Sequence, residues 1–146
     1  MGDTVVSVRR APFLLLVVAL AAACGGSKSY ASNADTICKK FTKQTSALGR
    51  PTDMMELASV ADKTLPLLDQ AAKQLAALQP PPDKRAEAQQ WLAQLGVLRA
   101  DLREIRDKAK SGDAAGLATV ALKAQQDNAK ANDLGRSLGF KVCDKN

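Results

Sequence analysis

The chain has 146 residues, enough for one domain of ordinary size, and carries a formal net charge of +6 at pH 7. It contains no histidine, which excludes imidazole-based acid–base catalysis, histidine metal ligands and the common axial ligand of haem. Aromatic residues make up only 3% of the sequence, whereas alanine and leucine are plentiful. This composition favours helix over sheet.

Residues 1–23 have the pattern of a secretory signal peptide. Arg9 and Arg10 form a basic N-terminal region, and residues 13–23 (FLLLVVALAAA) are wholly apolar. A membrane-spanning helix needs roughly 20 apolar residues, so this run is too short to remain as an anchor. Its length is typical of a signal that is cleaved after export. We therefore expect the mature protein to lie outside the cytoplasm.

The end of this segment, AAACGGS at residues 21–27, resembles the lipobox of bacterial lipoproteins, in which small residues precede an invariant cysteine. The resemblance implies that Cys24 receives a diacylglycerol thioether, becomes the mature N-terminus and anchors the protein to the cell membrane. The family prefers leucine three positions before the cysteine, where this chain has Ala21. The three alanines also satisfy the small-x-small rule of ordinary signal peptidase, which would leave the protein freely secreted.

Residues 24–32 continue without a hydrophobic pattern, and we expect them to form the lipidated cysteine and a flexible tether. The folded domain is predicted to span residues 33–146.

The chain has three cysteines. If Cys24 is acylated, Cys38 and Cys143 remain as a pair in an oxidising compartment, where we expect a structural disulfide. The alternative, a redox-active dithiol, typically has a C-x-x-C-like arrangement, which this sequence lacks. The disulfide would close a loop of about 105 residues, and it requires the first and last helical segments to end close together.

Four amphipathic segments follow the tether. The first is predicted to begin at Ser32 or Asn33, with Ser32 and Asp35 as a capping-box-like pair, and to end before the Gly-Arg-Pro sequence at 49–51. The second follows an N-cap at Asp53, and its apolar residues recur with a heptad spacing at positions 54, 58, 61, 65, 68, 72 and 75.

The third segment follows three prolines and a predicted N-cap at Asp83, and its apolar seam runs through positions 91, 95, 98, 102, 105 and 109. The fourth lies between an N-cap at Asp113 and Gly139 in the C′ position. Short links predict an all-α, up-down-up-down four-helix bundle. In this arrangement Cys38 and Cys143 meet at one pole, so that one disulfide closes the bundle.

The chain also resembles a broad group of small, Ala-rich exported proteins and lipoproteins that are common in actinobacteria. These proteins pair a cysteine early in the first helix with a terminal Leu-Gly-x-x-x-Cys sequence and carry prolines in mid-chain. The resemblance implies a disulfide-closed helical bundle whose biochemical role is generally unassigned. The matching residues here are Asn33, Ile37, Cys38, Pro80, Pro81, Leu138, Gly139 and Cys143.

Motifs for catalysis, metal binding, haem attachment or phosphate binding are missing from the sequence. The carboxylates considered as catalytic bases stand beside lysines or arginines on faces predicted to point outward; they are Asp62, Asp69, Asp101, Glu104 and Asp107. We therefore expect no enzyme, no cofactor and no metal site. Export and the lack of interleaved aromatic residues argue against nucleic acid as a partner.

Two polar features raise further hypotheses. Arg99, Arg103, Arg106 and Lys110 each stand one place after a seam residue, and this basic stripe is a candidate for contacts with anionic headgroups or wall polymers. The favoured alternative is that they bridge to acidic groups on neighbouring helices. Asn128 and Asn132 lie close to the seam of the fourth segment. One hypothesis is that they line a small-molecule cavity, and the favoured alternative is that they specify the register of the helices or face solvent.

Two functions remain open. The first is a membrane-anchored, non-enzymatic interaction module that binds another envelope protein through a helix face. The second is a carrier or sensor that holds a small apolar or anionic ligand in or beside the bundle core. Alanine-rich seams are expected to leave little void, whereas a carrier needs a pocket of several hundred cubic ångströms. Such a pocket ringed by Arg99, Arg103 or Asn128 would favour the carrier.

Overall fold

The structure is a computed structural model, and it describes residues 29–145. The predicted signal peptide and Cys24 lie outside the described residues. All four predicted helices are present, together with a short 3₁₀ turn: α1 (Tyr30–Ser46), α2 (Met54–Ala76), η1 (Pro82–Lys84), α3 (Arg85–Ser111) and α4 (Ala114–Ser137).

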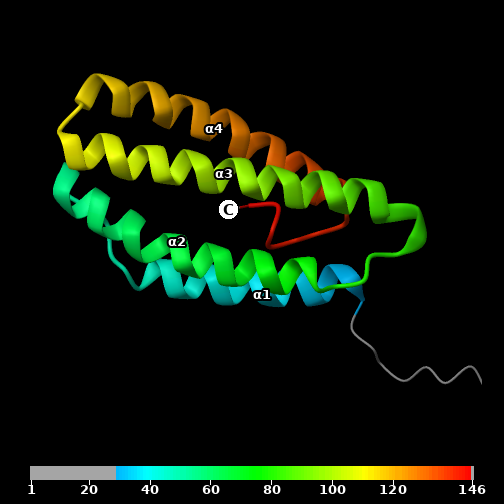
Figure 1. The fold of residues 1–146 in the computed structure, drawn as a ribbon. Helices are drawn as coiled ribbons and strands as arrows, with labels where there is room; N and C mark the ends of the chain where they lie inside the picture. The colour runs from blue at the N-terminus through cyan, green and yellow to red at the C-terminus, as the bar shows by residue number, and fades with distance from the viewer. Residues whose placement is uncertain (1–28, 146) are drawn as a thin grey trace, which may run out of the picture.

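The helices lie side by side in the order of the sequence (Figure 1), with α1 packed on α2, α2 on α3 and α3 on α4. The predicted all-α four-helix bundle is therefore confirmed. The bundle is open on one side, because α1 and α4 do not pack against each other. The C-terminal segment that follows α4 turns back instead and is joined to α1 by the predicted disulfide between Cys143 and Cys38.

The first helix begins earlier than the sequence indicated. It starts at Tyr30, inside the stretch 24–32 that was assigned to the tether, and Ser29 rather than Ser32 is its N-cap. The Ser29 side chain accepts a hydrogen bond from the backbone N–H of Ser32 at 3.2 Å. The Tyr30 ring lies 5.7 Å from the ring of Phe140, centroid to centroid, so packing with the C-terminal segment draws the first turn of the helix into the domain.

The caps of α2 and α4 match the prediction. Asp53 accepts a hydrogen bond from the backbone N–H of Glu56 at 2.8 Å, and the Glu56 carboxylate in turn accepts one from the backbone N–H of Thr52 at 2.8 Å. Asp113 accepts from the backbone N–H of Gly116 at 2.9 Å. The predicted cap at Asp83 is wrong: η1 precedes α3, and no side chain caps the start of that helix.

The largest buried side chains are gathered at the disulfide pole. Trp91 of α3 and Phe140 of the C-terminal segment are each only 1% exposed, and their rings meet edge to face with centroids 4.9 Å apart. Leu75, Leu138 and Cys143 belong to the same core cluster. The C-terminal segment is thus part of the core.

Two glycines, one inside α4 and one just after it, allow the C-terminal segment to reach this position. Gly139 has a φ of +80°, a left-handed conformation that glycine adopts without strain, and it ends the helix as predicted. A Cβ atom on Gly135 would lie only 3.3 Å from the Cα atom of Asp144. Glycine at 135 therefore permits the close return of the chain.

Candidate functional site

A groove of about 300 Å³ runs along the inner faces of all four helices. It exists because α1 and α4 do not meet, which leaves the inner faces of α2 and α3 partly uncovered. The expectation that alanine-rich seams would leave little void is therefore wrong. The groove is lined mainly by apolar side chains, among them Phe41, Leu68, Ala71, Leu75, Trp91, Leu95, Leu98, Leu102, Ile105, Ala124 and Ala131.

The groove is elongated and partly open to solvent, and the disulfide lies beside one end of its lining. Cys38 and Cys143 both contribute to its lining beside Trp91. Along α3 the lining continues to Ile105, which corresponds to about 21 Å at the helical rise of 1.5 Å per residue. The lining of the groove therefore follows α3 for about four helical turns.

Four polar side chains stand among the apolar residues that line the groove, namely Thr64, Asp101, Asn128 and Asn132. Asp101 is the most deeply buried of them, with 2% of the residue exposed. It was expected on an outer face of the third helix, and that expectation is wrong. Its position three residues after Leu98 and four before Ile105 places it on the same inward face.

The carboxylate of Asp101 is satisfied on one side only. Its Oδ1 accepts a hydrogen bond from Nζ of Lys123 on α4 at 2.5 Å, whereas its Oδ2 is buried and has no hydrogen-bond partner. The indole Nε1 of Trp91 is likewise buried without a partner. Two groove residues thus carry polar atoms whose hydrogen-bonding capacity is unmet within the described part of the chain.

Lys123 links the groove wall to a second carboxylate. Its Nζ also lies 2.8 Å from Oδ2 of Asp127, and the hydrogen bonds to Asp101 and Asp127 raise the pKa of Lys123 well above its usual range. Hydrogen bonds from Lys123 and Lys130 lower the pKa of Asp127 to about 2. Gln94 of α3 donates to the backbone carbonyl of Asp127 at 3.0 Å, so this polar network joins α3 to α4 beside the groove.

We expect this network to make stability depend on pH at the acid end. Because the pKa of Asp127 is lower in the folded protein than its ordinary 3.8, its contribution is present above about pH 4 and is lost as the pH falls to about 2. The wild-type protein should therefore have a higher melting temperature than Asp127→Asn at pH 6, and this difference should vanish at about pH 2. Thermal unfolding followed by circular dichroism measures the melting temperatures, with Asp133→Asn on the same helix as the control. A difference in melting temperature that stays constant across pH would contradict the prediction.

The basic stripe of α3 does not line the groove. Nη2 of Arg99 donates to Asp69 of α2 at 2.7 Å, and Nζ of Lys110 lies 2.7 Å from Asp62 of α2. Arg106 pairs with Asp107 at 2.8 Å and approaches Asp62 at 3.5 Å. These ion pairs favour the interpretation that the stripe bridges neighbouring helices.

Arg103, the fourth member of the stripe, is exposed and has no ion-pair partner among the residues that the structure describes.

The contacts between Lys110, Arg106 and Asp62 hold the pKa of Asp62 below its ordinary value, with the Lys110 hydrogen bond as the largest cause. The candidate anion contacts at Arg99, Arg106 and Lys110 are thus already engaged by carboxylates.

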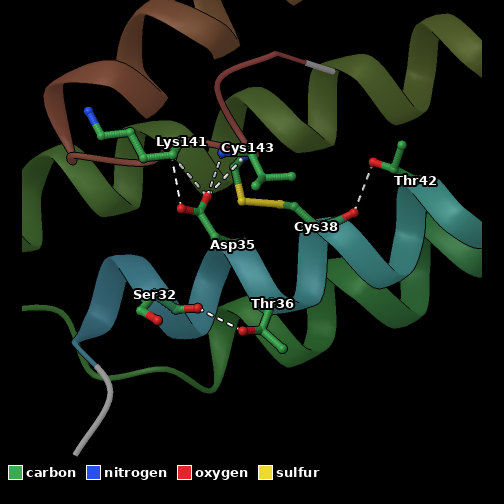
Figure 2. Close-up of a disulfide and its surroundings, with 8 residues drawn as sticks. Ser32, Asp35, Thr36, Cys38, Thr42, Lys141 and Cys143 are labelled. Carbon is green, nitrogen blue, oxygen red and sulfur yellow. Dashed lines mark hydrogen bonds between the residues drawn. A yellow bond between two sulfur atoms is a disulfide. The ribbon is translucent and has the colours of Figure 1, made fainter.

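Hydrogen bonds to Asp35 hold the C-terminal segment against α1 beside the disulfide (Figure 2), and the sequence did not predict them. The Asp35 carboxylate of α1 points at the returning chain and accepts hydrogen bonds from the backbone N–H groups of Lys141, Val142 and Cys143, at 2.9–3.1 Å. Asp35 was predicted to help cap its own helix. Its actual role depends on the turn after α4, which residue spacing does not specify.

Residues 29–145 contain no group of three or more His, Cys, Asp or Glu placed to hold a metal ion. None of the described helices is both long and apolar enough to cross a bilayer. Comparison of the chain with protein-family models, curated proteins and solved structures found no match.

Proposed function

We propose that this protein is an exported lipoprotein, anchored through Cys24, whose helical domain holds a small, mainly apolar ligand in the groove between its helices. The observation that carries this proposal is the groove itself. Its volume of about 300 Å³ lies at the lower end of the range for small-molecule sites, and such sites combine apolar walls with a few polar groups. Asn128 is among the lining residues, and its presence in the lining of a pocket is the feature expected of a carrier.

The groove favours the carrier over the interaction module. The exposed large apolar residues of the described chain, Met55, Val97 and Leu122, stand on three different helices, and single apolar residues of this kind are ordinary on protein surfaces. The groove, in contrast, gathers apolar side chains from all four helices. A helix-face interaction with another envelope protein therefore has less support than binding between the helices.

Binding also has more support than catalysis. The one buried carboxylate in the groove, Asp101, is paired with Lys123, and the chain has no histidine to act as a base. A lipid anchor at Cys24 would hold this domain close to the membrane, where apolar molecules concentrate. We therefore propose a role in holding or handing over such a molecule outside the cytoplasm.

Filling the groove tests the proposal. Ala131 of α4 is 3% exposed and lines the groove, so Ala131→Phe places a ring in the space meant for the ligand. We expect this change to weaken the binding of phenylnaphthylamine, an uncharged apolar dye, by about tenfold or more, because the added ring occupies space that the dye would fill and a tenfold loss of affinity corresponds to only about 1.4 kcal/mol. Trp91 is the only tryptophan of the chain and lines the groove, so energy transfer from it to the dye measures binding to the domain, and the effect of Ala131→Phe tells whether the dye lies in the groove.

Ala129→Phe is the matched control, because Ala129 lies on the same helix but is exposed. The control should bind the dye as the wild type does. Equal affinity of wild type, Ala131→Phe and Ala129→Phe, or dye binding without energy transfer from Trp91, would contradict the proposed function.

A further inference from the structure

We infer that the ligand of the groove carries an uncharged polar group, such as a hydroxyl, and that the carboxamide of Asn128 binds this group. The inference rests on the proposed function and specifies the chemistry of the molecule that the groove takes. It is drawn from the place of Asn128 on α4, from its unpartnered side chain and from the charges of the groove lining.

The spacing along α4 turns Asn128 towards the groove. Ala124 lies four residues before it, Ala131 and Asn132 lie three and four residues after it, and all of them line the groove together with Asn128. Residues with these spacings share one face of a helix. Alanine side chains end at Cβ, so the carboxamides of Asn128 and Asn132 are the groups that extend from this face of α4.

The carboxamide of Asn128 is unpartnered and accessible. Within residues 29–145 it makes no hydrogen bond to another residue. Asn128 is half-buried, and neither its Oδ1 nor its Nδ2 is fully buried, in contrast to Oδ2 of Asp101. A carboxamide offers both donors and an acceptor. A hydroxyl that lies against it can therefore donate one hydrogen bond and accept another.

The charges of the lining favour an uncharged group at this place. Among the described residues the lining contains no lysine or arginine, and its one carboxylate, that of Asp101, is paired with Lys123. A charged group beside Asn128 would lose water without gaining a counter-ion, which is unfavourable. A neutral hydroxyl loses less on leaving water, and the carboxamide restores its hydrogen bonds.

Competition between octanol and the groove-bound dye tests this role of Asn128. Asn128→Leu replaces the carboxamide with an apolar side chain of similar size. We expect the inhibition constant of octanol to rise about fivefold, which corresponds to the loss of about 1 kcal/mol for one hydrogen bond. The affinity for phenylnaphthylamine should stay close to that of the wild type, because the dye binds through its apolar rings. Dye binding also shows that the variant is folded.

Gln125→Leu is the matched control, because Gln125 carries the same carboxamide on the same helix but is exposed and does not line the groove. The control should bind octanol as the wild type does. Asn128→Ala removes the carboxamide without adding an apolar side chain and should weaken octanol binding to a similar extent, so the test stands even if Asn128→Leu does not fold. Octanoate should displace the dye from the wild type only at concentrations about tenfold or more above that of octanol.

Two results would overturn the inference while the groove function stands. One is an equal inhibition constant of octanol for the wild type and both Asn128 variants. The other is displacement of the dye by octanoate at the same concentration as by octanol. If the dye itself does not bind in the groove, as judged with Ala131→Phe, the proposed function fails and the inference fails with it.

Discussion

Replacing Cys38 and Cys143 together by alanine is expected to lower the free energy of unfolding by about 4 kcal/mol. The disulfide joins residues separated by 105 positions, and a cross-link that closes a loop of this length removes much of the conformational entropy of the unfolded chain. The variant should still fold, because Asp35 continues to accept the backbone N–H groups of the returning chain and Phe140 remains packed on Trp91. Urea unfolding of wild type and variant at one pH measures the difference.

A reductant provides the control for this experiment. Dithiothreitol should move the unfolding midpoint of the wild type towards that of the double variant and leave the variant unchanged. If wild type and variant unfold at the same urea concentration, the disulfide contributes no stability and this account of the C-terminal closure is contradicted.

Replacing Cys24 by serine is expected to move the protein from the membrane fraction to the soluble fraction of producing cells. The proposed diacylglycerol thioether carries two acyl chains, and each buried methylene adds about 0.8 kcal/mol to membrane binding. Serine offers no thiol for the thioether, so the anchor is lost entirely. Cell fractionation followed by immunoblotting against the helical domain measures this shift, and incorporation of labelled palmitate should disappear with it.

Ser27→Ala, three residues further on in the same segment, is the control and should remain with the membrane. Retention of the Cys24→Ser protein in the membrane fraction would count against lipidation. Release of the wild-type protein into the medium would instead support cleavage after the three alanines by ordinary signal peptidase.

Much of the fold follows from local signals in the sequence. The heptad spacing of α2 and α3 and the caps at Asp53 and Asp113 specify helices of nearly the observed length. The pairing of Cys38 with Cys143 follows from their number and from the up-down topology. The early start of α1 was missed because it depends on Tyr30 meeting Phe140, a contact between the two ends of the domain.

The groove was not predictable from the same signals. Helical periodicity tells which face of each helix points inward, but it does not tell whether α1 and α4 close over that face. The burial of Asp101 was missed because charged neighbours suggested an outer face, although its spacing from Leu98 and Ile105 matches the seam. Its partner Lys123 stands 22 positions away, so only the packing of α3 on α4 brings the two together.

Mass spectrometry of what the groove contains tests the central claim most directly. Wild type, Ala131→Phe and Ala129→Phe would be purified in parallel from the membranes of producing cells and extracted with organic solvent. The account predicts that wild type and Ala129→Phe release the same small apolar compound in a comparable amount and that Ala131→Phe releases much less of it. Identical extracts from all three proteins would contradict the claim that the groove holds a ligand.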